Sequence, residues 1–286
     1  MPEGDTIFRT ATSLRAWIGD RVITGATARD QRLRIDRLIG RRLAEVSTHG
    51  KHLFLEFEHV EPDGQAAELP APSTTPGSLV LRTHMMMTGS WHVYGVGDRW
   101  RKPQREAVVT LLAGERTAVC FNAPVVELLS KRRSEQVRSK TSLGPDILCE
   151  ILDIPEITRR AASLDGTVPI AVLLLDQHVV AGIGNIYRSE SLFLERINPV
   201  VPHGALGQNQ FEALLRRASL LMRSNLSTST HSTRSFGDSS PRPWVYGRSG
   251  LPCRRCRTLI ESDKLGVQAR TAFWCPSCQP LLSRLA

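Results

Sequence analysis

The sequence predicts an α+β protein in three parts, on three observations. A helical pattern at the N-terminus is followed by short apolar runs between turn residues, which is typical of a β-rich domain. Helical periodicity takes over near Gly144, and two cysteine pairs stand close to the C-terminus. We therefore predict a β-rich domain with an N-terminal helix at 1–143, a helical domain at 144–240 and a small metal-binding unit at 241–286.

The first helix is predicted from Glu3 to Ile18, because apolar residues recur on one face at helical spacing. These residues are Ile7, Phe8, Ala11, Leu14, Trp17 and Ile18. Strands are predicted at 21–23, 53–57, 79–81, 107–112 and 118–121. Three helices are predicted in the second domain, at 170–180, 186–195 and 208–223. The Pro- and Ala-rich stretch 61–77 and the Ser- and Thr-rich stretch 224–240 predict loops.

Near the C-terminus stand Cys253-x-x-Cys256 and Cys275-x-x-Cys278. Two thiolate pairs, each from a tight turn, complete a tetrahedral site, so the spacing predicts one structural Zn²⁺. A unit this small has little core, and the metal would stabilise its fold. Redox pairs are the alternative. Between the pairs, 259–260 and 271–274 are predicted to form a hairpin with Arg270 near its tip.

The net charge of +9 and the isoelectric point near 9.7 favour a polyanionic partner, with nucleic acid first, although many basic proteins bind none. No apolar run approaches the roughly 20 residues of a membrane helix. The N-terminus also lacks the pattern of a signal peptide. We expect a cytoplasmic protein with no membrane partner.

At the N-terminus, removal of Met1 would leave Pro2 with a free secondary amine, which can attack a carbonyl and form an iminium ion. The positive end of the first helix disfavours a charged amine there, and so would Lys51 if it lies nearby. Glu3 can act beside it as a general acid or base. The alternative is that Pro2 and the acidic residues after it simply start a helix well.

Two further segments suit contact with DNA. Gly182–Asn185 reads as a glycine-containing turn between helices, which can offer backbone N–H groups and the Asn185 side chain to phosphate; Asn185 as a helix N-cap is the alternative. The run His84–Gly89 holds three consecutive methionines, which cannot all face a core because strand residues alternate. An exposed methionine can act as a wedge between bases. The alternative places Met85 and Met87 in the core.

Together these segments resemble the formamidopyrimidine-DNA glycosylase and endonuclease VIII family. The resemblance rests on Pro2-Glu3-Gly4, His49-Gly50-Lys51, His84–Gly89, Gly182–Glu190 and the cysteine unit at 245–279. It implies a two-layered β-sandwich with an N-terminal helix, a helix-two-turn-helix domain and a zinc-finger β-hairpin. It also implies binding to damaged double-stranded DNA, and we expect a monomer.

The resemblance further implies a bifunctional DNA glycosylase and AP lyase of base excision repair, which cuts the strand by β,δ-elimination. Pro2 would be the nucleophile at the sugar C1′, and Glu3 would move protons on the opening sugar. Lys51 and Arg270 complete the predicted catalytic residues. The predicted DNA-binding residues are His84, Asn185, Arg270 and Met87, the last filling the void left by the flipped base.

The start Pro2-Glu3-Gly4-Asp5-Thr6 is more similar to the endonuclease VIII branch than to the Pro-Glu-Leu-Pro-Glu start of 8-oxoguanine glycosylases. The endonuclease VIII branch prefers oxidised pyrimidines, so this resemblance implies oxidised pyrimidines as substrates. Two alternatives compete. A non-catalytic DNA-binding protein on the same scaffold would be indicated by loss of Pro2, Glu3 or Lys51, and all three are present. An N-terminal-proline tautomerase needs neither a zinc finger nor a basic surface.

Overall fold

The computed structural model describes residues 2–60, 77–140, 143–227, 233 and 243–281. The chain divides into two compact units. The first holds Met1–Pro2 and Thr6–Thr141, and the second holds Glu3–Asp5 and Ser142–Ala286. The predicted loops at 61–77 and 224–240 lie almost entirely outside the described residues. The predicted boundary between the second and third domains stays a prediction.

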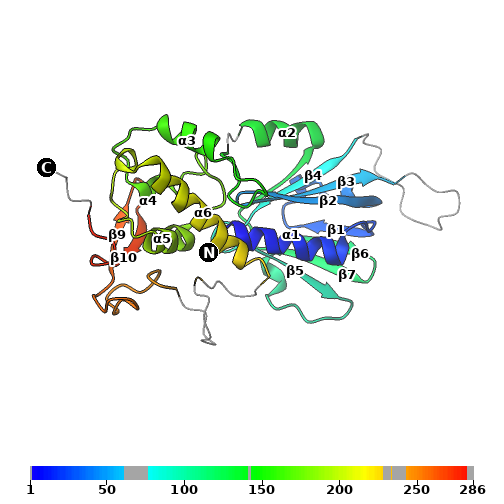
Figure 1. Ribbon diagram of the computed structural model, residues 1–286. Coiled ribbons are helices and arrows are strands. Elements are labelled where there is room, and N and C mark those ends of the chain that lie inside the picture. The colour runs from blue at the N-terminus through cyan, green and yellow to red at the C-terminus, as the bar shows by residue number, and fades with distance from the viewer. Residues whose placement is uncertain (1, 61–76, 141–142, 228–232, 234–242, 282–286) are drawn as a thin grey trace. The chain divides into compact units, whose positions relative to one another are not determined.

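The first unit is a sandwich of two four-stranded antiparallel sheets (Figure 1). The first sheet has the order β2 (Arg41–His49), β3 (His52–His59), β4 (Leu79–His84) and β8 (Val125–Ser130). The second has the order β1 (Gly25–Ala28), β6 (Ala107–Ala113), β7 (Arg116–Phe121) and β5 (Ser90–Gly95). Short 3-10 turns lie at Gln31–Leu33, Ile35–Leu38 and Gln104–Glu106.

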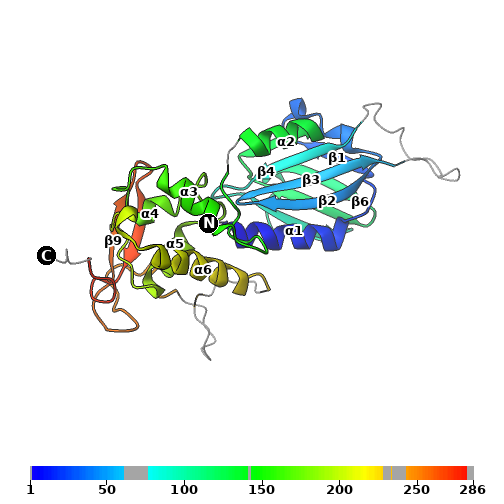
Figure 2. The same ribbon diagram turned by 45° about the horizontal axis from the view of Figure 1, so that its top comes forward.

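Helix α1 (Gly4–Ile18) runs beside the sandwich and contributes to its core (Figure 2). Four of the apolar residues predicted on one face of this helix are buried: Ile7, Ala11, Leu14 and Ile18. Trp17 belongs to the same predicted face but has 44% of its surface exposed. Its ring instead lies under the Arg116 guanidinium, 4.3 Å from the ring centre, at the edge of the apolar face.

Several elements of the sandwich were not predicted, namely β1, β2, β5, β8 and helix α2 (Lys131–Lys140). The predicted strand at 21–23 forms only an isolated bridge between Val22 and Arg42. Helix α2 was not predicted because it has no apolar stripe. Its cations hold it to the sheet instead: Arg138 stacks on Phe54 and Lys131 pairs with Glu56 at 2.7 Å.

One end of the sandwich, which we call the loop end, carries three turns. Strand pairing brings together the turns at 50–51, 85–89 and 122–124, because His49 faces His52, His52 faces His84 and Ser90 faces Phe121. In the second sheet, β5 and β6 both pair antiparallel with β7 between them, so they run in the same direction. Residues 96–106, which connect β5 to β6, must therefore run back along the length of the strands to the loop end.

The second unit is helical with a small hairpin. Its elements are α3 (Ile154–Ala162), α4 (Ile170–Leu173), α5 (Asn185–Leu194), a 3-10 turn at His203–Ala205, α6 (Gln208–Ser224), β9 (Glu261–Leu265) and β10 (Arg270–Trp274). The predictions for α5, α6 and β10 are confirmed. The helix predicted at 170–180 is wrong beyond Leu173: Val179 and Val180 are buried from a turn, so apolar periodicity continues without a helix.

The first hairpin strand also differs from the prediction, since β9 begins at Glu261 and Leu259 forms only an isolated bridge to Pro252. The core of this unit packs α3, α4, α5 and α6 together, and a separate small cluster lies under the cysteine segment. Within the described part of the chain, we find no helix with the length and apolar character needed to cross a membrane.

Candidate active site

Glu3 is the most constrained of the predicted catalytic residues. Its fully buried carboxylate accepts hydrogen bonds from the N–H groups of Gly184 (2.9 Å), Ile186 (2.8 Å) and Tyr187 (3.4 Å) at the start of α5. A helix N-terminus favours negative charge, so this position stabilises the carboxylate form of Glu3. A side chain at Gly184 would begin 2.3 Å from the Glu3 Cδ, which explains the glycine there.

The residues after Glu3 are fixed by the same segment. The Gly4 N–H donates to the Gly182 carbonyl at 3.0 Å, and a Cβ on Gly4 would lie 3.2 Å from the Gly182 Cα. The Tyr187 hydroxyl donates to the buried Asp5 carboxylate at 2.9 Å. Helix α1 begins at Gly4, so Pro2 precedes it rather than forming its first residue. Pro2 thus stands immediately before a carboxylate whose position is set by the fold.

These contacts correct one expectation. The N–H groups of Gly184, Ile186 and Tyr187 bind the Glu3 carboxylate, so they are not offered to phosphate. Asn185 is the first residue of α5 and Gly184 occupies the N-cap position, so the N-cap alternative for Asn185 does not hold either. The Asn185 side chain stays the predicted phosphate ligand at this turn.

Arg188 holds that side chain, and sequence reasoning missed it. Its buried guanidinium donates to the Asn185 Oδ1, to the Thr271 carbonyl at 2.6 Å and to the Ala171 carbonyl at 3.4 Å. Burial lowers the pKa of Arg188 to about 10, and the charge of Glu3 opposes this shift. Arg188 therefore remains a cation at neutral pH.

Through Arg188 the two predicted phosphate ligands of the second unit are connected. Arg270 is the exposed first residue of β10, directly before Thr271, and it follows the turn at Gly266–Ala269 as predicted. The Tyr246 hydroxyl hydrogen-bonds with Asn185, and burial raises the pKa of Tyr246. The sequence carries no periodic signal for Arg188, because polar and apolar residues are mixed in this helix.

In the first unit, Lys51 lies in the turn between β2 and β3, and His84 ends β4 beside His52, with ring centres 4.5 Å apart. Burial lowers the pKa of His52 to about 3 and that of His84 to about 4, and the charge of Lys51 contributes to both shifts. Both rings are neutral near pH 7.

The tautomers of these rings follow from their partners. Arg82 donates to Nδ1 of His52 at 3.2 Å, and the Met86 N–H donates to Nδ1 of His84 at 3.2 Å. Each ring therefore carries its proton on Nε2. Arg82 is in turn paired with Glu127 at 2.7 Å. Neither His52 nor Arg82 was predicted as part of the site.

The methionine run is divided by the fold. Met85 is buried, whereas Met86 is 51% and Met87 60% exposed, and Met86 has a positive φ of 48°. The alternative that placed both Met85 and Met87 in the core is wrong for Met87. The Gly89 N–H donates to the Met85 carbonyl at 2.8 Å and closes the turn. The turn therefore exposes two methionine side chains to solvent, Met86 and Met87.

The four cysteines of the C-terminal segment converge. Their Sγ atoms all lie within 4.8 Å of one another, with Cys253 to Cys278 at 3.9 Å and Cys256 to Cys275 at 3.4 Å. In a tetrahedral zinc–thiolate site the sulfur atoms are about 3.8 Å apart. The N–H groups of Arg255 and Cys278 point at the sulfurs of Cys253 and Cys275. The donor set fits one tetrahedral metal ion.

Glu190, on α5, fastens the segment that leads into this cysteine cluster. Its buried carboxylate accepts from the N–H groups of Trp244 (2.7 Å), Val245 (2.9 Å) and Tyr246 (2.9 Å), and from the Thr233 hydroxyl. Helix α5 therefore positions the Asn185 side chain at one end and the entry to the cysteine segment further along.

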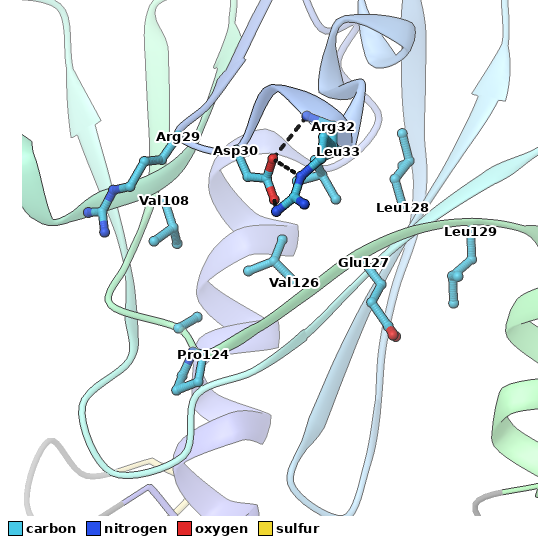
Figure 3. A pocket seen from close by; sticks show the side chains of 11 residues that line it. Arg29, Asp30, Arg32, Leu33, Val108, Pro124, Val126, Glu127, Leu128 and Leu129 are labelled. Atoms are coloured by element: carbon cyan, nitrogen blue, oxygen red, sulfur yellow. Dashed lines mark hydrogen bonds and ion pairs between the residues drawn. The ribbon is translucent and has the colours of Figure 1, made fainter.

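A cavity of about 750 Å³ in the first unit is lined by none of the predicted site residues. Figure 3 shows it beside the Asp30–Arg32 ion pair, whose nitrogen and oxygen atoms are 2.9 Å apart, with Val126 below the pair and Leu128 to its right. The predicted chemistry does not use this cavity.

Comparison with known proteins decides the family. The formamidopyrimidine-DNA glycosylase N-terminal domain matches residues 1–124, and the H2TH domain of the same glycosylase matches residues 143–236. The chain belongs to the formamidopyrimidine-DNA glycosylase family. The H2TH and N-terminal domains confirm the predicted architecture, and this membership makes the chain a DNA-repair enzyme of the glycosylase and lyase type.

The relatives place it in the endonuclease VIII-like branch. It is 34% identical to the "Probable endonuclease 8 2" of Streptomyces coelicolor, over 98% of this chain and 94% of that one. It is 33% identical to the "DNA-(apurinic or apyrimidinic site) lyase Nei2" of Mycolicibacterium smegmatis, over 98% and 99%. The Fpg of Lactococcus lactis, solved with an N7-benzyl-Fapy-dG-containing DNA, has a TM-score of 0.77 over 98% and 100%. At 22% identity that likeness shows the fold alone.

Proposed function

We propose that this enzyme removes oxidised pyrimidines from damaged double-stranded DNA and then cuts the strand, acting as a monomer with Pro2 as the nucleophile. The observation that carries the proposal is the position of Glu3. Three N–H donors at the start of α5 hold its carboxylate one residue after Pro2, so an acid–base group stands beside the N-terminal amine.

In the proposed reaction the Pro2 nitrogen forms a bond to C1′, and the bond from C1′ to the base breaks. Glu3 donates and accepts protons on the sugar oxygen as the ring opens. The resulting iminium ion withdraws electrons, so the 2′ proton is lost and the 3′ phosphate leaves. A second elimination releases the 5′ phosphate, and a one-nucleotide gap with phosphate at both ends results.

The remaining predicted residues position the DNA. Lys51 and Arg270 neutralise phosphate and assist catalysis, and Asn185 donates to phosphate from an orientation fixed by Arg188. The proton on Nε2 of His84 suits the same role, because Nδ1 is occupied by the Met86 N–H. Met87 fills the void left by the flipped base. The preference for oxidised pyrimidines is supported by the Pro2–Thr6 start and by the names of the relatives.

We further propose that the four cysteines hold one structural Zn²⁺, which when bound ties the two cysteine turns together. Cys253 and Cys275 are buried and lie against Val245 and Ile260, so the ion would also close the small core of this segment.

Borohydride reduction tests the nucleophile. It should trap the protein covalently on duplex DNA that carries an oxidised pyrimidine or an abasic site, with the DNA attached to Pro2 in peptide maps. Retaining Met1 or adding an N-terminal tag should abolish trapping and leave DNA affinity largely intact. Attachment at Lys51, together with normal cleavage by the N-terminally blocked protein, would overturn the assignment.

A cleavage panel tests the substrate separately. Oligonucleotides with single defined lesions, in duplex and in single-stranded form, should be cut fastest when an oxidised pyrimidine lies in the duplex. Faster cutting of oxidised purines, or of the single strand, would contradict the preference without touching the assignment of Pro2.

A further inference from the structure

The connection between β5 and β6 returns to the loop end of the sandwich and brings basic side chains with it. We call residues 98–106 the crossover arm. Its last residue, Glu106, accepts a hydrogen bond from the Asn122 side chain at 2.7 Å, and β6 then begins at Ala107 opposite Phe121. Ser90, the first residue after the methionine turn, also pairs with Phe121. The arm therefore ends beside the turn that exposes Met86 and Met87.

Hydrogen bonds connect the arm to that turn directly. The Lys102 ammonium donates to the Thr88 carbonyl at 3.5 Å, and the Thr88 hydroxyl donates to the Asn122 carbonyl at 3.1 Å. Asn122 in turn bonds to Glu106 through both its side chain and its backbone N–H. The methionine turn, the turn at Asn122 and the crossover arm form one connected network.

An aromatic cluster on the outer face of the sheet holds the arm in place. Trp100 stacks on Tyr94 with ring centres 5.9 Å apart and meets Phe121 edge-on at 5.7 Å. The Arg101 N–H donates to the Tyr94 hydroxyl at 3.0 Å. Such a cluster fixes the backbone at Trp100, so the charged side chains on either side are presented from a rigid support rather than a free loop.

The arm carries cations that the described part of the protein does not neutralise. Arg99, Arg101 and Arg105 are exposed and, like Lys102, form no ion pair with an acid among the described residues. The acids of the arm are engaged otherwise, because Asp98 accepts from the Gly95 N–H and Glu106 from Asn122. The pKa of His92 reports this local charge: burial lowers it, and Lys102 and Arg101 lower it further.

We propose that the crossover arm is a DNA-contact surface in which Arg99, Arg101 and Lys102 bind backbone phosphates next to the step where Met86 and Met87 enter the duplex. This inference rests on the proposed function. A polyphosphate backbone matches the arm because it supplies regularly spaced anions and needs no base-specific contact. Phosphate contacts beside an inserted side chain would hold the distorted step and repay part of the cost of unstacking.

The test compares two triple variants with the same change of charge. The arm variant is Arg99→Gln, Arg101→Gln, Lys102→Gln. The matched control is Arg21→Gln, Arg42→Gln, Arg116→Gln, at the end of the sandwich away from the turns, where Arg42 faces Glu58 and Arg116 faces Gly95. Affinity for a duplex with a stable abasic analogue is measured by fluorescence anisotropy from 0.05 to 0.5 M salt, and the melting temperature confirms folding.

For the arm variant we expect the slope of log K against log salt to become shallower by about 2.7, because each of the three lost phosphate contacts removes about 0.9. If the binding lines of the parent and the variant meet at about 1 M salt, this is a loss of about 170-fold in affinity at about 0.15 M salt. The control should stay within about threefold of the parent protein, which is the range for general charge effects.

A second measurement uses the single variant Arg101→Gln, at an exposed side chain, and keeps the proposal falsifiable if the arm variant folds poorly. Single neutral methylphosphonates are scanned through the duplex with the parent protein, with Arg101→Gln and, where it folds, with the arm variant. One to three positions flanking the lesion should weaken parent binding, and at least one of them should have no further effect on Arg101→Gln. Equal slopes for the arm and control variants, or identical methylphosphonate profiles for the parent and Arg101→Gln, would overturn the proposal. Failure of the parent itself to trap with borohydride would instead contradict the proposed function.

Discussion

At the scale of single residues, Glu3 shows how a catalytic group can be fixed from far along the chain. Its carboxylate oxygens both accept N–H donors from α5, so the substitution Glu3→Gln would turn an amide N–H₂ toward N–H donors. We expect base removal to fall by about 10²- to 10⁴-fold, the range for loss of a general acid or base. Cleavage of a preformed abasic site should be affected far less, since that substrate needs no base removal.

Product gels with lesion-bearing and abasic duplexes measure the two steps of this prediction. Asp5→Asn is the matched control, because Asp5 is equally buried and its carboxylate accepts a hydrogen bond from the Tyr187 hydroxyl. If Glu3→Gln slows both substrates to the same extent, the role of Glu3 is structural.

The paired histidines at the loop end give a pH prediction. The pKa of His52 is about 3 and that of His84 about 4, both below the value of 6.5 for an exposed ring. Between these values the unfolded chain binds more protons, so the free energy of unfolding should fall as the pH drops from about 6.5 toward 4. Above pH 6.5 these two rings should contribute no pH dependence.

Urea unfolding followed on tryptophan fluorescence at pH 7.5, 6.5, 5.5 and 4.5 measures this. His52→Gln keeps an acceptor for Arg82 and removes one titrating ring, so its stability should fall less steeply with acid than that of the parent. His178→Gln, at an exposed histidine of the second unit, is the comparison. A parent and a His52→Gln variant with parallel pH curves would contradict the prediction.

Site residues could be predicted from the sequence where the chemistry of the site requires particular residue types. The four cysteines fit a metal by their spacing alone, and the positions of Arg270 and of the exposed Met87 agree with expectation. The hydrogen-bond partners of Glu3 could not be predicted from the sequence, because they are backbone N–H groups about 180 positions away along the chain. Arg188 was missed because a buried cation inside a helix follows no periodic pattern.

At the scale of elements, α5 organises much of the second unit through Glu190. Glu190→Gln should replace a carboxylate that accepts from three successive N–H groups by an amide with one acceptor oxygen. We expect a loss of about 2–3 kcal/mol in the attachment of residues 244–246, from hydrogen bonds to a charged group. Limited proteolysis should then cut near Trp244 faster than in the parent. Glu195→Gln, at the C-cap of the same helix and in a surface ion pair with Arg217, should not change the cleavage rate.

The cysteine element gives a prediction about metal. Cys275→Ser should lower the zinc content from about one ion per chain and loosen the hairpin β9–β10, because this small unit has little core of its own. DNA binding should weaken together with strand cleavage, since β10 carries Arg270. Elemental analysis and anisotropy measure both effects. Cys149→Ser, at an exposed cysteine outside the cluster, should keep the metal. Folded, active parent protein without bound metal would rule out the zinc site.

Elements were predictable where one periodicity dominated. Helix α6 buries an apolar face along most of its length and was found at nearly the right bounds. Helix α5 was also found at nearly the right bounds, although its buried residues run without a break from Ile186 to Phe193 and include polar ones. Helix α2 could not be predicted from hydrophobic periodicity, because the cations Arg138 and Lys131 hold it to the sheet. The helix at 170 was extended too far because Val179 and Val180 continue the apolar spacing from a turn. The crossover arm could not be foreseen, since it follows from the strand order of the sheet.

At the scale of the whole molecule, the positions of the cations decide how the net charge of +9 relates to DNA binding. Surface ion pairs neutralise some of them, as at Arg159 with Glu156 and Arg216 with Glu212. Lys51, Arg270 and the crossover arm belong instead to segments that carry the proposed chemistry. A protein whose basic residues were merely spread for solubility would bind DNA weakly and without regard to damage.

The salt dependence of the complete protein tests this distribution. Each phosphate that a cation neutralises releases counterions, so log K should fall with log salt at about 0.9 per contact. Four to six contacts, including Lys51, Arg270 and part of the crossover arm, predict a slope of roughly −4 to −5. Anisotropy with an abasic-analogue duplex between 0.05 and 0.5 M salt measures it, and an undamaged duplex of the same length is the control. The two slopes should be similar while the affinities differ, because phosphate contacts set the slope and the flipped nucleotide sets the preference. A slope near zero on damaged DNA would mean that the basic residues are not the binding surface.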